Sequence, residues 1–290
     1  MAELQTGRVT VEEGIVFGRG GGRDLKCDVF MPPQQGTERP GVLLVHGGGW
    51  VRGDRSQLRG YGILLGRLGY VCVACEYRLA GEAKWPAQIH DVKAALRWMR
   101  ANASQLGIDP RKIAVEGNSA GGHLSLIVAG TPNLPAFEGD GGNQGVPTDV
   151  AACVAFYAPT QFRRPGVDMS QLRDAVAFLF GPGVSEETVD LASPITHAKP
   201  GFPPTMLLTG NKDQLVDSRE SIRMQRALAD ANVPAELHVF DGLPHAFDAL
   251  PDFGRQCASL MALFLDRVMV NPRAIVVPGQ AETTPVASSA

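Results

Sequence analysis

The sequence GNSAG at positions 117–121 places Ser119 between small residues and fits the pattern G-x-S-x-G. The apolar run Ile113–Val115 before it predicts the end of a buried strand, and the residues from Gly122 onward have helical character. A strand that turns into a helix within a few residues strains the serine backbone and leaves no room for Cβ atoms at positions 117 and 121. The pattern therefore predicts a nucleophile elbow with an exposed Ser119 hydroxyl. On its own it fits an ordinary tight turn equally well.

A second stretch of small residues, HGGGW at 46–50, follows the apolar run Val42–Val45. Three successive glycines leave backbone N–H groups unshielded, so two of them can point at one oxygen atom. The Ala120 N–H lies at the start of the helix after Ser119 and is expected to join them in a three-donor oxyanion hole. The alternatives are a flexible turn or a phosphate cradle. A cradle would be followed by Lys, by Ser or Thr and by a helix, a pattern that the sequence after Trp50 lacks.

His245 is the histidine best placed to activate a serine hydroxyl, which needs a base within hydrogen-bond reach. It lies in a loop late in the chain, after the apolar run Ala235–Phe240, as the order Ser, acid, His requires. The other histidines are predicted to be structural; they are His46, His90, His123, His197 and His238.

Asp213 is the best candidate for the carboxylate that orients such a base. It follows an apolar run and a short turn, so it projects from the carboxyl end of a predicted strand, the edge at which catalytic groups collect. Asp217 is the second candidate. Asp241 and Asp248 flank His245 in sequence, but positions so close together rarely give the required angle.

Strand-like apolar runs alternate with helical segments along most of the chain, which predicts an α/β fold with a mostly parallel sheet. A hairpin of Arg8–Phe17 and Asp24–Phe30 is expected to form an antiparallel edge. The later runs bring the total to about eight strands; they are Val42–Val45, Val71–Cys75, Ile113–Val115, Val150–Tyr157, Thr205–Leu208 and Ala235–Phe240. Amphipathic helices are predicted at Pro86–Arg100, Ser218–Ala231 and Phe253–Val270.

We expect one domain at residues 1–270 and a flexible tail at 271–290, which is rich in Pro, Ser, Thr and Ala and has no catalytic role. Two long excursions, 131–148 and 160–203, interrupt the regular alternation. Long excursions in a compact domain are usually functional or disordered, so both are predicted to wall the substrate pocket, with Gln161–Phe180 as a partial lid. The alternative is that both are surface loops.

The composition argues against several classes of protein. The chain has 290 residues, of which 44% are hydrophobic and 20% charged, as in folded globular proteins. A net charge of −3 without a long run of Lys and Arg gives no reason to expect nucleic acid or a membrane as a partner. Because the first residues lack a basic and then apolar leader and no apolar stretch would cross a bilayer, we expect a soluble, cytoplasmic protein. The five cysteines, an odd number without metal-site spacing, are predicted to be packing residues.

Taken in order, these motifs resemble the α/β-hydrolase esterases of the hormone-sensitive-lipase type, over about residues 10–270. The matching motifs are HGGGW at 46–50, GNSAGG at 117–122, GNKDQLVDS around Asp213 and LPHAF around His245. Two further segments, EYRLAGEAKWPAQIHDVKAALRW and FEGDGGNQGVPTDVAACVAFYAPT, look most like the branch of acetyl-xylan and feruloyl-type esterases. The chain departs from the resemblance in two ways: Asn118 replaces an acidic residue of many relatives, and a hairpin replaces the helical N-terminal cap of the lipase-like branch. The second departure favours an open acyl pocket over long-chain lipase activity.

The resemblance implies an α/β-hydrolase fold with helices on both faces of the sheet, and a serine carboxylesterase that cleaves short-chain esters through an acyl-enzyme. By their positions in the motifs, Ser119 is similar to the nucleophile, Asp213 to the acid, His245 to the base, and Gly48, Gly49 and Ala120 to the oxyanion donors. A small-molecule ester is implied as substrate, with no metal and no organic cofactor, and the sequence does not indicate an oligomeric state. An amidase resembling kynurenine formamidase remains an alternative. A non-catalytic receptor on the same fold is disfavoured, because such receptors usually lack a member of the triad and all three are present here.

Overall fold

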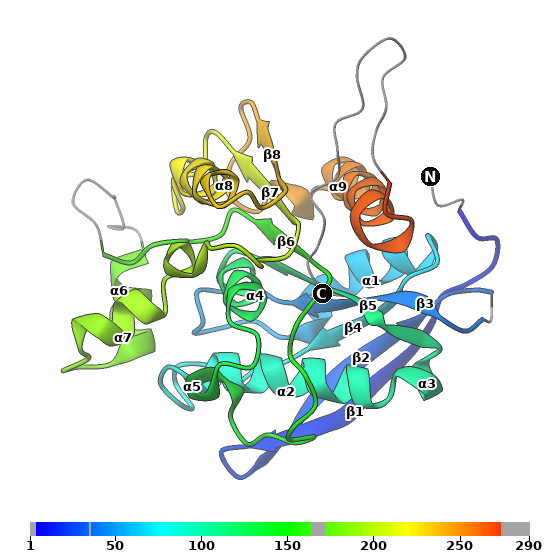
Figure 1. Cartoon of the computed structure of the whole chain (residues 1–290), viewed down its shortest axis with the longest axis horizontal. Helices are drawn as coiled ribbons and strands as arrows, with labels where there is room; N and C mark the ends of the chain where they lie inside the picture. The colour runs from blue at the N-terminus through cyan, green and yellow to red at the C-terminus, as the bar shows by residue number, and fades with distance from the viewer. Residues whose placement is uncertain (1–3, 35, 164–171, 274–290) are drawn as a thin grey trace.

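The computed structural model describes residues 4–34, 36–163 and 172–273 (Figure 1). Within these residues one eight-stranded sheet has the order β1-β2-β4-β3-β5-β6-β7-β8. The strands are β1 (Thr10–Gly20), β2 (Arg23–Met31), β3 (Arg39–Val45), β4 (Val71–Cys75), β5 (Ile108–Asn118), β6 (Ala152–Phe156), β7 (Thr205–Gly210) and β8 (Ala235–Phe240). The β1–β2 hairpin and the β2–β4 pair are antiparallel, and every other pair is parallel. The predicted α/β class and mostly parallel sheet are confirmed.

The helices follow the strands as the alternation predicts. The longer ones are α1 (Arg59–Gly66), α2 (Ala87–Ala101), α4 (Ala120–Gly130), α6 (Arg173–Phe180), α8 (Arg219–Asp230) and α9 (Pro251–Leu265). The shorter segments are α3 (Ala103–Leu106), α5 (Pro135–Glu138), α7 (Glu186–Leu191), η1 (Arg55–Leu58), η3 (Pro194–His197), η4 (Phe247–Ala249) and the π-helical turn η5 (Asp266–Val270). None of the described helices has the length and apolar character needed to span a membrane.

The three predicted amphipathic helices correspond to α2, α8 and α9, and the last continues into η5 as a π-helical turn. The sequence pattern does not predict α1, whose eight residues include three glycines. One of these glycines has a packing reason, because a Cβ atom at Gly62 would lie 2.6 Å from the Phe30 ring. Because close packing on the sheet requires glycine at position 62, α1 lacks the residue pattern from which a helix is predicted.

Helices cover both faces of the sheet, and this explains why the central strands read as continuous apolar runs. Every residue of β4 and of β6 is buried. Leu43 packs into one core together with α2, α4 and α8, whereas the adjacent Leu44 packs into the other core with α1 and α9. The five cysteines are free and buried in these two cores, and burial raises the pKa of each thiol, so they are packing residues as predicted.

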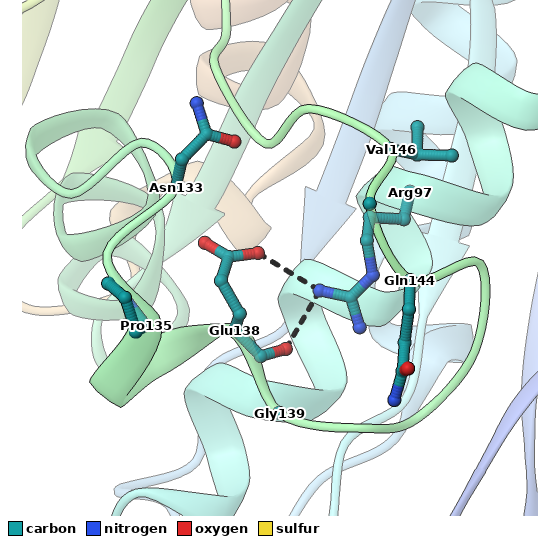
Figure 2. Close-up of a pocket in the computed structure, with 8 residues that line it drawn as sticks. Arg97, Asn133, Pro135, Glu138, Gly139, Gln144 and Val146 are labelled. Carbon is teal, nitrogen blue, oxygen red and sulfur yellow. Dashed lines mark hydrogen bonds and ion pairs between the residues drawn. The ribbon is translucent and has the colours of Figure 1, made fainter.

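The first excursion, 131–148, is tied to α2 by charged side chains. Lys93 Nζ donates to the Thr131 carbonyl oxygen and pairs with Glu138 at 2.7 Å. Arg97 donates to the carbonyl and the carboxylate of Glu138 at 2.7 and 3.1 Å, as Figure 2 shows. Arg97 and Glu138 border a cavity of about 380 Å³ that none of the predicted site residues lines. The pocket-wall role of this excursion stays a prediction.

The second excursion, 160–203, contains α6, α7 and η3. Residues 164–171, which form part of the predicted lid Gln161–Phe180, lie outside the described residues. The described part includes α6, which lies against the HGGGW segment: a Cβ atom at Gly49 would be 3.6 Å from Ala175 Cβ. Of the predicted tail, positions 274–290 also lie outside the described residues, and the domain limits stay predictions.

Candidate active site

Ser119 forms the sharp turn between β5 and α4, with φ = 55° and ψ = −116°. A Cβ atom at Gly117 would lie 2.3 Å from the Gly121 carbonyl oxygen, and one at Gly121 would lie 1.9 Å from the Val45 carbonyl oxygen. Both distances are far below van der Waals contact, so only glycine fits at either position, as the G-x-S-x-G pattern predicts. A left-handed, non-glycine backbone at such a turn is the strained geometry found at functional sites.

His245 lies in the loop after β8 and contacts both of its predicted partners. Its Nε2 is 3.0 Å from Ser119 Oγ, and its Nδ1 is 2.6 Å from Asp213 Oδ2. A carboxylate can only accept, so Nδ1 carries the proton and the lone pair of Nε2 faces the serine hydroxyl. The imidazole is therefore in the tautomer that a general base for Ser119 requires.

Asp213 follows β7 and is held rigidly. Its side chain is 0% exposed. The second carboxylate oxygen, Oδ1, accepts the backbone N–H groups of Leu215 and Val216 at 2.8 and 2.9 Å. These two donors fix the plane of the carboxylate and leave Oδ2 directed at His245.

The three predicted oxyanion donors follow the carboxyl ends of β3 and β5. Gly48 and Gly49 have φ values of 112° and 61°, which favour glycine. The Gly48 carbonyl oxygen accepts the N–H groups of Val51 and Arg52, and this closes the loop. In the described part of the chain, the N–H groups of Gly48, Gly49 and Ala120 donate to no acceptor, so all three remain available for one.

The remaining candidates do not reach this group. The other five histidines bond to backbone carbonyls or, for His238, to Glu236; their partners are Gly47 for His46, Ala136 for His90, Ala192 for His123 and Leu191 for His197. Asp217, the second candidate acid, accepts hydrogen bonds from Arg219. Asp241 accepts a hydrogen bond from Asn211. The structure therefore brings Ser119, Asp213 and His245 together and leaves the alternatives apart.

His123, on the second turn of α4, has a structural role in an aromatic cluster beside the HGGGW loop. The Trp50 indole donates to its Nδ1 at 3.2 Å, and its Nε2 donates to the Ala192 carbonyl at 2.8 Å. Burial lowers the pKa of His123 to about 4, so it is neutral near pH 7. The rings of Trp85 and Phe162 also pack on it. Buried side chains thus fill the space behind the glycine loop and tie α4 to the second excursion.

The sequence did not predict a polar network that lies next to the His245 ring. Tyr157 follows β6, and its ring centroid lies 4.4 Å from that of the His245 imidazole. The Tyr157 hydroxyl donates to Asp248, which also accepts from Tyr61 at 3.0 Å and from Asn118 at 2.7 Å. The only sequence signal for Tyr157 is its place at the end of an apolar strand, and Asp248 is a rejected candidate acid.

Glu116, on β5, is buried beside this network. It is 0% exposed, and in the described part of the chain neither carboxylate oxygen has a hydrogen-bond partner. Burial and the nearby charge of Asp248 hold the pKa of Glu116 well above its ordinary value. Both effects favour the protonated form of Glu116.

A cavity of about 380 Å³ opens beside His245. Its lining residues are Lys212, Gln214, Leu215, Pro244 and His245. Among the described residues, no group of three or more His, Cys, Asp or Glu side chains could hold a metal ion. The Ser119 hydroxyl lies within hydrogen-bond reach of His245, and the N–H groups of Gly48, Gly49 and Ala120 have no acceptor among the described residues. This arrangement is suited to attack on a carbonyl group.

Comparison with known families finds a matching family model and relatives that are named as esterases. Residues 27–228 match the family model BD-FAE. The probable carboxylic ester hydrolase LipM of Mycobacterium tuberculosis is 34% identical over 286 residues, which are 91% of this chain and 63% of LipM. The chain covers 63%, 58% and 55% of the first three curated relatives it matches. The resemblance to hormone-sensitive-lipase-type esterases is confirmed.

Solved structures show the same architecture. A truncated carbohydrate esterase from gut microbiota superimposes with a TM-score of 0.77 at 23% identity, over 89% of this chain and 97% of that one. Thermogutta terrifontis esterase 2 with bound propionate gives a TM-score of 0.75 at 27% identity, over 90% and 94%. Another structure of that esterase is phosphoramylated by tabun. The predicted α/β-hydrolase fold is therefore confirmed.

Proposed function

The chain belongs to the BD-FAE family, and from this membership and the site geometry we propose that it is a serine carboxylesterase acting on short-chain carboxylic esters. One observation carries the proposal: His245 bridges Ser119 and Asp213, with distances of 3.0 and 2.6 Å to their oxygen atoms. The named relatives are esterases or ester hydrolases, which supports the same reaction class.

In the first step, His245 Nε2 takes the Ser119 hydroxyl proton as Oγ attacks the ester carbonyl carbon. The Oγ–C bond forms, and the carbonyl oxygen becomes an oxyanion. Asp213 stabilises the imidazolium through the Nδ1 hydrogen bond of 2.6 Å. The imidazolium then gives its proton to the alkoxide oxygen, which leaves as the alcohol, and the acyl group stays on Ser119.

The oxyanion is stabilised by backbone donors that are already in place. The N–H groups of Gly48, Gly49 and Ala120 would converge on it, and the Ala120 donor adds the positive end of the α4 dipole. Loss of one such donor typically costs about a hundredfold or more in turnover. Because the donors belong to backbone held by glycine geometry, little reorganisation accompanies the reaction.

In the second step, water repeats the sequence on the acyl-enzyme. His245 takes a proton from the water as its oxygen attacks the acyl carbon. The second oxyanion then collapses, the C–Oγ bond breaks, and the imidazolium returns its proton to Ser119 Oγ. The product is a carboxylic acid. This acyl-enzyme route agrees with the covalent tabun adduct of the Thermogutta esterase, since such an adduct requires an activated nucleophile.

Two features support short acyl chains. Trp50, Trp85, Phe162 and Phe180 form a buried aromatic cluster that includes the last residue of HGGGW at 46–50, so the space that these rings occupy is closed to an acyl chain. The Thermogutta esterase has structures with propionate and with butyrate. An amidase like kynurenine formamidase would use the same residues. Comparing the rates of hydrolysis of ester and formamide substrates distinguishes the two activities.

The test is hydrolysis of p-nitrophenyl esters from acetyl to lauroyl, with ethyl ferulate and formyl-kynurenine alongside. The native protein, Ser119→Ala and Ser259→Ala are compared, the last being an exposed serine on α9. We expect activity that is highest on short esters, is lost by at least about a thousandfold in Ser119→Ala, and is unchanged in Ser259→Ala. A Ser119→Ala protein that keeps its rate would falsify the proposal, and preference for formyl-kynurenine would favour the amidase.

A further inference from the structure

The nucleophile and the base belong to different segments, so their separation depends on what holds those segments together. Ser119 follows β5, and His245 follows β8; β6 and β7 lie between these strands in the sheet. The reaction needs Oγ and Nε2 to stay within hydrogen-bond reach, at the observed 3.0 Å. Asp213 holds the imidazole at one nitrogen, and its other oxygen is held by its own loop rather than by the segment that carries Ser119.

The side chain of Asp248 connects the segment that carries His245 directly to the segment that carries Ser119. Asp248 lies three positions after His245, and Asn118 immediately precedes Ser119. Asn118 Nδ2 donates to Asp248 Oδ2 at 2.7 Å and to the Tyr157 hydroxyl at 2.9 Å. A single hydrogen bond therefore joins the end of β5, before Ser119, to the base loop, which carries His245 and Asp248.

The donors around Asp248 are matched to a carboxylate. The hydroxyl groups of Tyr61 and Tyr157 and the amide of Asn118 all donate to it. Burial and the charge of Asp248 raise the pKa of both tyrosines, so each keeps its proton. Turning the Asn118 amide over would place its oxygen against the carboxylate, so Asp248 also fixes which end of the amide faces it.

The base loop needs such an anchor because its backbone is strained. Ala246, directly after His245, has φ = 57°, a left-handed conformation that costs a non-glycine residue free energy. Tyr157 also has a positive φ, of 35°, and its ring packs on the imidazole at 4.4 Å. The same tyrosine therefore supports the ring of His245 and donates to Asp248.

We propose that Asp248 is a positioning residue that holds His245 at the correct distance from Ser119, through its hydrogen bonds to Asn118 and Tyr157. The inference rests on the proposed serine esterase function and adds a residue outside the Ser119–His245–Asp213 group. Asp248 acts through other residues and does not touch the reacting atoms.

The test uses a polarity swap across the link. Four variants are compared with the native protein: Asp248→Asn, Asn118→Asp, the double variant with both changes, and Asp252→Asn. Asp252 is a control for loss of a nearby carboxylate, since its side chain is 91% exposed and pairs with Arg255 on the surface of α9. The double variant restores one amide and one carboxylate in reversed positions, so the side chain at position 248 would donate and the side chain at position 118 would accept.

We expect Asp248→Asn and Asn118→Asp each to lower kcat for a p-nitrophenyl ester by about ten- to hundredfold, with KM changed by less than about threefold. The double variant should regain at least about tenfold over the worse single variant, and Asp252→Asn should match the native protein. Circular dichroism and Tm show whether each variant is folded. A double variant as slow as the product of the two single losses would show that the residues act independently and would overturn the proposal, as would a kcat loss below about twofold in Asp248→Asn.

A second readout does not depend on turnover. The hydrogen-bonded Nδ1 proton of His245 should give a low-field proton resonance, which we expect to shift or broaden in Asp248→Asn and to return in the double variant. If the native protein hydrolyses no ester, the proposed function fails while this resonance still tests the link. If the resonance is the same in all variants, Asp248 does not position the imidazole, whatever the activity.

Discussion

Ser119 Oγ and His245 Nε2 lie 3.0 Å apart, although 126 positions separate the two residues in the chain. They meet because β5 and β8 are parallel strands of one sheet and end at the same edge. The loop after β7, between them in sequence, brings Asp213 to the same place.

Asp213→Asn should abolish most activity without unfolding the protein. The N–H groups of Leu215 and Val216 would hold the asparagine oxygen, which leaves its NH₂ group facing His245 Nδ1. Because two donors cannot pair, the imidazole would move its proton to Nε2 and could no longer accept one from Ser119. We expect kcat to fall by about 10³- to 10⁴-fold with little change in KM. Asp217→Asn is the matched control and should stay within about threefold; an Asp213→Asn variant with more than about a tenth of native kcat would contradict the assignment.

Gly48→Ala and Gly49→Ala should distinguish an effect on the direction of the N–H groups in the HGGGW segment, 46–50, from an effect on the stability of that segment. A Cβ atom at Gly48 would lie 2.1 Å from the Arg52 carbonyl oxygen, so the loop must shift and its N–H groups must turn. At Gly49 the nearest atom would be 3.6 Å away, so alanine is accommodated at a cost of about 1 kcal/mol for its left-handed backbone. We expect kcat to fall by about a hundredfold or more in Gly48→Ala and by less than about tenfold in Gly49→Ala. Kinetics with thermal unfolding of both variants provide the check, and equal losses would contradict the steric argument.

Glu116→Gln should change how stability depends on pH. The pKa of Glu116 is raised in the folded protein by burial, so above about pH 4.5 the unfolded chain loses a proton that the folded protein retains. The folded state then binds more protons than the unfolded state, and stability falls with rising pH by up to about 1.4 kcal/mol per pH unit until the folded pKa is reached. Glutamine does not titrate and removes this loss.

The measurement is Tm against pH from about 4.5 to about 8.5 for the native protein, Glu116→Gln and Glu12→Gln, the last an exposed glutamate on β1. Relative to the native protein, Glu116→Gln should gain stability steadily as pH rises, whereas Glu12→Gln should show no such trend. A constant difference between Glu116→Gln and the native protein would mean that Glu116 is ionised in the folded state.

The motifs named three residues that the structure brings together, because each of these residues lies next to a strand end. Asp213 and His245 each follow an apolar run, and the carboxyl ends of parallel strands converge. The partners of Asp248 could not be predicted in this way. Its closeness in sequence to His245 argued against a direct role as the acid, and the structure agrees, since Asp248 bonds to Tyr61, Tyr157 and Asn118 instead. No local pattern links it to those three residues, which come from other strands and helices.

Hydrophobic periodicity and glycines at fixed spacing were enough to predict the alternation of strands and helices and the elbow at Ser119. Asp213 and His245 were chosen because each follows an apolar run and because the order Ser, acid, His is required. Only the tertiary structure shows which partner each carboxylate bonds to. The Asp213 side chain is sealed from solvent and directed at His245 by two N–H groups of its own loop, whereas Asp248 is directed at Asn118. Long-range packing makes that choice, since a side chain's partners depend on the segments that the sheet brings beside it, and this information is absent from the local sequence.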